Sequence, residues 1–316
     1  MSTEVETVKA VEWVLEGAGR LGRNVAQLPS PAAGEILVAT MMGAISPGAE
    51  RVLLHGTSPL VGEGGYPYQP GYLNVVRILD APDRTLVGER GIAILGHRDF
   101  ALVPYAKFVR IPSNVTDENA MLGVLAADAR NAIEIASVGP KDRSLVIGGG
   151  ILGVLTAWEL CHRTNEEVRI VERDPARREL IQAIRFPRNV VRDAEPGNAK
   201  WHFVFDCANG SDAFDLAQQV ARPGASIVLV ADGSHEKYSL SPQFFAKGLY
   251  LGKTDANPDL RSFLAEWFSR HEDRESLLDV AFRDEIRFTA YPQAYLEALL
   301  GPPERRRGLL PRVRYD

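Results

Sequence analysis

The stretch SLVIGGGILGVLTAWEL, residues 144–160, decides the fold of this chain. A short apolar run precedes three consecutive glycines and an apolar helical pattern follows them, which is the order strand, tight turn, helix. Gly148, Gly150 and Gly153 have the spacing G-x-G-x-x-G. In such a turn the first glycine allows the bend, the second lets a pyrophosphate approach the backbone, and the third lets the helix pack closely on the strand. The segment therefore predicts a dinucleotide-binding turn.

The helix after the glycines is expected to hold the anionic part of the dinucleotide. Ile151 and Leu152 open this helix, where free backbone N–H groups and the positive end of the helix dipole bind phosphate. Nineteen residues after Gly153, a second expected strand ends in Glu172, whose carboxylate can accept hydrogen bonds from the adenosine ribose. A carboxylate there repels a 2′-phosphate and favours NAD(H), whereas the adjacent Arg173 would pair with that phosphate and keeps NADP(H) open.

Strands and helices alternate through the middle of the chain, whereas the first third is rich in strands and turns. Asp174-Pro175 opens a further helix, with aspartate as N-cap and proline at the first helical position. More strands are expected at 189–191, 202–207 and 226–230. This α/β alternation predicts a Rossmann-type, doubly wound parallel sheet with helices on both faces, joined to a β-rich domain that resembles a small barrel or sandwich.

Composition excludes several classes of protein. The 316 residues are 45% hydrophobic and 24% charged, which is typical of a globular protein of about two domains. A net charge of −5 argues against a nucleic-acid or anionic-membrane partner, since both require a basic surface.

The cysteines and the first residues indicate a compartment. Cys161 and Cys207 lie in apolar segments and are interpreted as buried thiols, which fits a reducing environment. No apolar run approaches the ~18 residues that span a bilayer. Residues 1–11 carry glutamates rather than a basic and apolar leader. We expect a cytoplasmic protein.

These features together resemble the medium-chain dehydrogenase/reductase superfamily over nearly the whole chain. Beyond the glycines, the resemblance rests on four stretches: PSPAAGEILVATMMGAISPGAE (29–50), YQPGYLNVVRILDA (68–81), GHRDFALVPYAKFVRIP (96–112) and FVFDCANGSDAFDLAQQVARPGASIVLV (203–230). The resemblance implies a GroES-like catalytic domain of residues 1–125 and 256–316 and a Rossmann domain of residues 126–255.

Within the superfamily, the motifs look closest to the group that contains 3-hydroxyethyl bacteriochlorophyllide dehydrogenase. That group has a Ser-x-Gly-x-Glu turn, here residues 46–50, and a Gly-Tyr pair, here residues 71–72. Leu73 departs from the group, which tends to keep an acid after its tyrosine.

The resemblance also bears on metal content. Ser46, Tyr72 and Leu73 stand where zinc-dependent members have cysteine, histidine and glutamate. A catalytic zinc needs about three ligands of the Cys, His or carboxylate type, and the four-cysteine lobe that holds a structural zinc in many relatives is absent. We expect a protein without zinc, in which hydrogen-bond donors meet the developing oxyanion.

Five residues are candidates for the catalytic site. Tyr72 either donates a proton or fills the former zinc pocket, with Ser46 beside it. Glu50 either orients a donor or is a helix-start carboxylate favoured by the helix dipole. His97 is either functional or a structural histidine. Asp128 stands where relatives often have a threonine near the nicotinamide carboxamide, or it is a surface partner of Arg130.

The resemblance favours reversible oxidation of a secondary alcohol to a ketone on a specialised natural-product or pigment metabolite. Reduction of an activated C=C bond, and use of NAD(P) without net redox turnover as in a lyase, epimerase or sensor, remain alternatives. Tyr66, Tyr68 and Tyr72 suggest a flat or bulky small-molecule substrate, although tyrosine-rich turns also occur as packing. A homodimer is the expected assembly.

Overall fold

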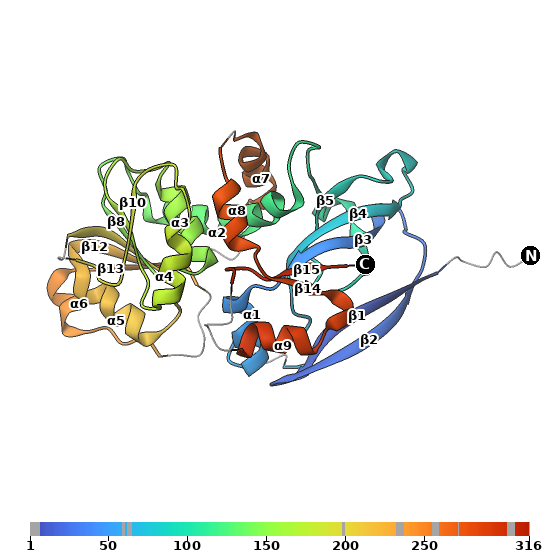
Figure 1. Ribbon diagram of the computed structural model, residues 1–316, viewed down its shortest axis with the longest axis horizontal. Helices are drawn as coiled ribbons and strands as arrows, with labels where there is room; N and C mark the ends of the chain where they lie inside the picture. The colour runs from blue at the N-terminus through green and yellow to red at the C-terminus, as the bar shows by residue number, and fades with distance from the viewer. Residues whose placement is uncertain are drawn as a thin grey trace, which may run out of the picture. The chain divides into compact units, whose positions relative to one another are not determined.

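The computed structural model describes residues 7–58, 61, 65–197, 200–231, 237–254, 259–270, 272–301 and 307–315 (Figure 1). The chain divides into two compact units. The first unit contains residues 1–122, 282–306 and 310–316, and the second contains residues 123–281 and 307–309. Each unit is built around its own sheet.

The second unit contains a six-stranded parallel sheet in the order β10-β9-β8-β11-β12-β13. Its strands are β8 (Ser144–Ile147), β9 (Val168–Val171), β10 (Val190–Asp193), β11 (Trp201–Asp206), β12 (Ala221–Leu229) and β13 (Tyr250–Lys253). The chain enters at β8 in the middle of the sheet, builds outward to β10, returns to β11 beside β8, and builds out in the other direction. This order is doubly wound, and it confirms the predicted fold class.

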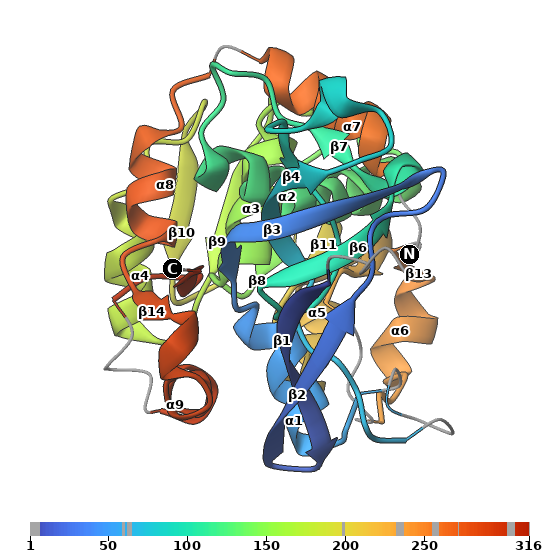
Figure 2. The same cartoon turned by 90° about the vertical axis from the view of Figure 1, so that its right-hand side faces the viewer.

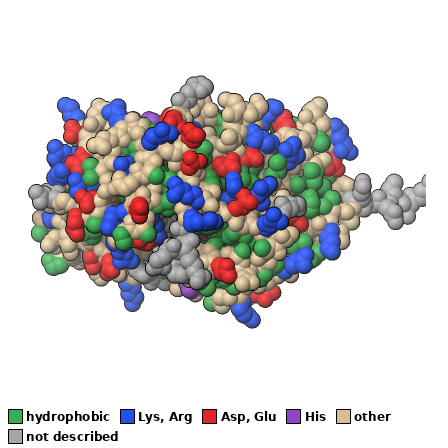
Figure 3. Space-filling model, viewed as in Figure 1, with side chains coloured by type: hydrophobic (Ala, Val, Ile, Leu, Met, Phe, Trp, Pro, Cys, Tyr) green, Lys and Arg blue, Asp and Glu red, His purple; other side chains and the backbone are tan. Residues whose placement is uncertain are grey.

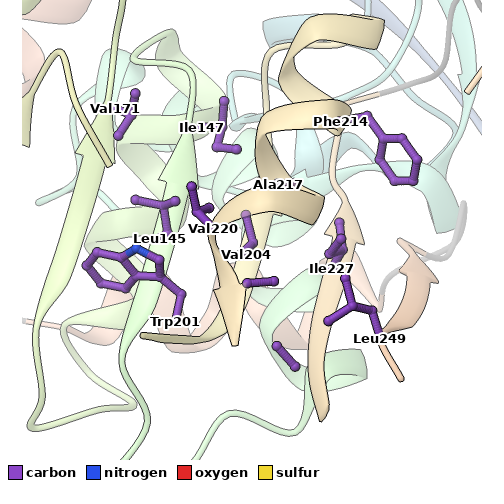
Figure 4. Close-up of a cluster of buried hydrophobic side chains, with 12 residues drawn as sticks. Leu145, Ile147, Val171, Trp201, Val204, Phe214, Ala217, Val220, Ile227 and Leu249 are labelled. Atoms are coloured by element: carbon purple, nitrogen blue, oxygen red, sulfur yellow. The ribbon is translucent and has the colours of Figure 1, made fainter. Parts of the chain in front are cut away.

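The helices of the second unit are α2 (Asp117–Ala136, whose first turns belong to the first unit), α3 (Ile151–Leu160), α4 (Pro175–Gln182), α5 (Ser211–Val220), α6 (Pro242–Lys247), α7 (Leu260–Ser269) and α8 (Glu275–Ala281). α4 begins as predicted, because the Asp174 side chain accepts a hydrogen bond from the Ala176 N–H at 2.9 Å. Figure 4 shows α5 over the sheet, where Phe214 and Ala217 join a buried cluster with Val204. This apolar face fixes the helix on the sheet.

The first unit is β-rich, as predicted. It contains a sheet in the order β14-β15-β3-β4-β5-β7, in which β6 also pairs with β3. It also contains a separate two-stranded hairpin of β1 and β2. The strands are β1 (Val8–Gly17), β2 (Arg20–Leu28), β3 (Glu35–Ala44), β4 (Leu73–Asp80), β5 (Arg90–Ile92), β6 (Phe100–Pro104), β7 (Val109–Arg110), β14 (Glu285–Arg287) and β15 (Arg312–Arg314). The helices are α1 (Pro47–His55) and α9 (Gln293–Leu300), with short 3-10 turns at Arg84–Leu86, Tyr105–Lys107 and Phe288–Ala290.

The C-terminal segment completes the first unit. β15 pairs antiparallel with β3, so that Arg312 lies opposite Ala44, and β15 lies beside β3 in Figures 1 and 2. Tyr295 of α9 is buried in one core cluster with Leu54 of α1. Residues from both ends of the chain therefore form one core.

Residues 259–281 lie in the second unit, whereas the sequence analysis expected them in the catalytic domain. Leu264 and Trp267 of α7 are fully buried, and a Cβ added to Gly123 of α2 would lie 2.6 Å from Leu264 and 2.9 Å from Trp267. The missing side chain at Gly123 thus lets α7 pack closely on α2.

The surface is mixed in charge. Figure 3 shows Lys, Arg, Asp and Glu side chains interspersed on the visible face. Among the helices that the structure describes, none has the length and apolar character needed to cross a bilayer.

Candidate functional site

The three glycines of the predicted turn have three different environments, and each matches one expected task. Gly148 has φ +101°, a conformation that favours glycine. A Cβ on Gly150 would meet no atom within 4 Å, so space is open next to this backbone. A Cβ on Gly153 would lie 1.9 Å from the Gly148 carbonyl oxygen, so α3 packs on the turn only because this side chain is missing. The turn fits a dinucleotide.

The turn lies where the strand order of the sheet reverses, between β8 and β11. The Cys207 N–H donates to the Ile147 carbonyl at 2.9 Å, and a Cβ on Gly148 would lie 3.2 Å from Ala208. The loops after the two strands are therefore adjacent. Ligands of open parallel sheets bind at such a switch point, beyond the carboxyl ends of the strands. Sequence reasoning missed the contribution of Ala208, because only the strand order brings it to the turn.

Glu172 follows β9 and is 4% exposed. Its Oε2 accepts hydrogen bonds from the Gly149 N–H at 2.8 Å and from Arg177 at 3.2 Å, and its Oε1 accepts from the Asp174 N–H at 2.9 Å. Three protein donors thus hold the carboxylate against the glycine turn, and the acceptor position left on Oε1 is the one that a ribose hydroxyl can use. The contact between Arg177 and Glu172 was not predicted from the sequence, although the two residues are only five positions apart. Arg173 is 89% exposed and lies 3.8 Å from Asp212.

The first unit brings four of the five catalytic candidates together. Ser46 is the N-cap of α1, and Tyr72 immediately precedes β4. The Tyr72 hydroxyl donates to Ser46 Oγ at 2.9 Å. Glu50 Oε1 accepts from the Ser46 N–H at 2.8 Å, and Glu50 Oε2 lies 2.9 Å from His97 Nε2. A chain of contacts therefore connects Tyr72 to His97.

The fifth catalytic candidate belongs to the other unit, and two of the tyrosines make contacts of their own. Asp128 lies on α2, in the second unit. Its proposed surface partner, Arg130, forms ion pairs with Glu159 and Glu266. Tyr66 donates to the Leu53 carbonyl at 2.8 Å, and Tyr66 and Tyr68 both pack against the core of the first unit.

The residues at the three positions where zinc-dependent dehydrogenases are expected to have ligands do not fit a zinc ion. The Ser46 and Tyr72 hydroxyls bond to each other, and Leu73 is apolar and fully buried. In the part of the chain that the structure describes, no group of three or more His, Cys, Asp or Glu side chains is arranged to hold a metal. Neither cysteine belongs to this site, because Cys161 and Cys207 both lie in the second unit, where burial raises the pKa of the Cys161 thiol to about 11 and that of Cys207 to about 12.

No family model matches the sequence. The curated proteins that are similar to it include two named 2-desacetyl-2-hydroxyethyl bacteriochlorophyllide A dehydrogenase. The protein from Cereibacter sphaeroides is 26% identical over 235 residues, which are 68% of this chain and 72% of that protein. The protein from Rhodobacter capsulatus is 29% identical over 180 residues, which are 52% of this chain and 56% of that protein.

Solved structures share the architecture over nearly the whole chain. An Escherichia coli CFT073 protein named short chain alcohol dehydrogenase, in complex with NADH, matches with a TM-score of 0.79 and 19% identity and covers 97% of this chain and 99% of its own. A structure from Sinorhizobium meliloti 1021, bound to NADP and named for a zinc-binding dehydrogenase, matches with a TM-score of 0.78 and 16% identity over the same shares. The fold is that of these dehydrogenase structures. It combines a Rossmann domain with a GroES-like domain, as predicted.

Proposed function

We propose that this protein is an NAD(P)-dependent oxidoreductase that interconverts a secondary alcohol and a ketone without a catalytic zinc. The observation that carries the proposal is the glycine turn at the switch point of the sheet, with open space at Gly150 and close packing at Gly153. This geometry accommodates a pyrophosphate at the start of α3. The dehydrogenase fold and the names of the curated relatives support the redox assignment.

The first unit supplies hydroxyl groups for the proton transfer. When bound, NAD(P)H supplies the hydride for the carbonyl carbon, and NAD(P)⁺ accepts it in the reverse direction. Tyr72 is half-buried and bonded to Ser46, so the two hydroxyls form a neutral pair of donors. During reduction the Tyr72 O–H turns from Ser46 Oγ to the substrate oxygen and gives up its proton, while the Ser46 hydroxyl donates to the Tyr72 oxygen in its place. Tyr72 then regains a proton from water, and during oxidation each of these steps runs in reverse. These neutral hydrogen-bond donors stabilise the negative charge that develops on the substrate oxygen. In zinc-dependent enzymes the metal stabilises this charge as a Lewis acid.

The substrate class that we propose is a specialised metabolite with a hydroxyethyl or acetyl type of group. The names of both curated relatives describe a hydroxyethyl group in place of an acetyl group, which is an alcohol in place of a ketone. Because Tyr66 and Tyr68 pack against the core, they offer little support for a flat substrate.

Steady-state turnover tests the proposal. Purified protein should consume NADH or NADPH with methyl ketones and reduce NAD⁺ or NADP⁺ with the matching secondary alcohols. Tyr72→Phe removes the hydroxyl and little else, and it should lower kcat by roughly 10²-fold or more while thermal unfolding stays close to wild type. Turnover with enones alone would support C=C reduction instead. Tightly retained cofactor without consumption of NAD(P)H would support a role without net redox chemistry.

We also propose that two copies associate through β13. This strand lies at the edge of the parallel sheet, and its Tyr250 and Leu251 are 68% and 46% exposed. An exposed apolar edge strand readily pairs with another chain. Light scattering should give the mass of a dimer, and Tyr250→Asp should shift it toward the monomer.

A further inference from the structure

His97 and Glu50 form a pair that the proposed chemistry leaves unused. The two side chains are fully buried, and His97 Nε2 lies 2.9 Å from Glu50 Oε2. Burying two ionisable groups is costly, and hydrophobic residues of similar volume often stabilise a fold as well or better. The pair therefore calls for an explanation other than stability.

One end of the pair fixes Ser46. Ser46 is the N-cap of α1, but its hydroxyl makes no capping bond to that helix. Glu50, four residues after Ser46, instead reaches back and accepts from the Ser46 backbone N–H at 2.8 Å, as the acid of a capping box does from one residue earlier. This arrangement orients the Ser46 backbone and leaves its hydroxyl to accept from Tyr72.

The other end of the pair fixes the segment that carries Tyr72. The backbone N–H of His97 donates to the Pro70 carbonyl oxygen at 2.9 Å. A Cβ added to Gly71 would lie 2.7 Å from the imidazole ring of His97, so the two residues are in close contact. On the other side of Tyr72, Asn74 is fully buried and its Nδ2 donates to the carbonyl of Gly96 at 2.9 Å. His97 and its neighbour thus hold the chain before and after Tyr72.

The contacts close into a ring. It runs from Tyr72 through Ser46, Glu50 and His97 to Pro70, which stands two residues before Tyr72. The Tyr72–Ser46 hydrogen bond is therefore held from both of its ends by one buried pair.

Aromatic side chains from the C-terminal segment enclose this pair. The rings of Tyr291 and Tyr295 lie 5.4 Å and 5.9 Å from the His97 ring. Burial, and next the charge of Glu50, raises the pKa of both tyrosines, so their hydroxyls stay neutral around the pair. Water has little access here, and interactions of the pair are correspondingly strong.

We propose that Glu50 and His97 are positioning residues, which set the Ser46–Tyr72 hydrogen bond and thereby the place where Tyr72 exchanges its proton. The role rests on the proposed function of Tyr72. Neither residue touches the substrate; each acts through Tyr72. Loss of the pair should lower kcat and leave the affinity for NADH unchanged, because the glycine turn belongs to the other unit.

A double-mutant cycle tests this role through activity. Glu50→Gln keeps the shape and the acceptor for the Ser46 N–H but removes the charge, and it should lower kcat about tenfold. If Glu50 acts through Tyr72, the double variant Glu50→Gln/Tyr72→Phe should be no slower than Tyr72→Phe alone. Multiplying effects in the double variant would overturn the positioning role. Full activity in Tyr72→Phe would instead overturn the function proposed for Tyr72.

A second measurement works without turnover. In the NMR spectrum of protein labelled with ¹³Cζ-tyrosine, the Tyr72 resonance is identified as the signal that is lost in Tyr72→Phe. Glu50→Gln should change the chemical shift of this resonance, because it alters the Tyr72–Ser46 hydrogen bond. Leu54→Val is the matched control, since it shortens a fully buried side chain on the same helix and lowers the unfolding midpoint without touching the ring of contacts. It should leave both the resonance and kcat near wild type. An unmoved resonance in Glu50→Gln, or an equal displacement in the control, would overturn the proposal.

Discussion

Replacing Gly150 with valine separates cofactor binding from folding. Gly150 has φ −70° and ψ 177°, which any L-residue adopts, and its Cβ would meet no protein atom within 4 Å. We therefore expect the free energy of unfolding to change by no more than about 1 kcal/mol. The branched side chain would fill the space next to the backbone where the pyrophosphate must lie. Affinity for NADH should fall well over tenfold, which corresponds to a loss of at least about 1.4 kcal/mol of binding free energy.

Gly153→Ala is the informative contrast. Its Cβ would lie 1.9 Å from the Gly148 carbonyl oxygen, about 1 Å closer than real Cβ contacts come. α3 would have to shift, so we expect a loss of 1–3 kcal/mol or more in stability, typical of overpacking. Calorimetric titration with NADH and thermal unfolding of both variants measure the two effects. Wild-type affinity in Gly150→Val would refute the cofactor site at this turn, and unfolding of that variant would refute the open space.

Three further outcomes are expected. The protein should bind NADH more tightly than NADPH, because the Glu172 carboxylate repels a 2′-phosphate. Tighter binding of NADPH in side-by-side titrations would show instead that Arg173 and Arg177 determine the cofactor preference. Elemental analysis of protein purified without added metal should find far less than one zinc per chain, and stoichiometric zinc would contradict the assignment of Ser46 and Tyr72. Chelators should leave turnover intact, whereas a loss that added zinc reverses would argue for a metal-dependent reaction.

Local signals were sufficient to predict the Rossmann half. β8 ends at Ile147 and α3 begins at Ile151, as the glycine spacing predicts, because these boundaries depend on the turn itself. The Asp174 cap was likewise predicted from a residue and its neighbours. The packing of α7 on α2 was not, since it depends on Gly123 facing Leu264, a contact between distant segments that no periodicity reports.

In the candidate site, too, local motifs were predictable from the sequence and contacts between distant segments were not. The Ser-x-Gly-x-Glu and Gly-Tyr motifs pointed to Ser46, Glu50 and Tyr72, which the structure brings together, but the place of His97 among them depends on tertiary structure. Asn74 and the tyrosines around His97 had no signal in the sequence, because a buried hydroxyl or amide looks like any other core residue until its neighbours are known.

The return of the C-terminal segment also sets an order of events during synthesis on the ribosome. Ala44 of β3 pairs with Arg312 of β15, so the first unit lacks an edge of its sheet and part of its core until β15 has been translated. Nearly all of the second unit is one uninterrupted stretch, 123–281, and emerges earlier. We expect the Rossmann half to fold first. At that stage the N-terminal strands are not yet packed, and apolar side chains such as Leu15 and Ile45 are still exposed. Residues 1–122 are thus the part of the nascent chain whose apolar side chains stay uncovered for longest.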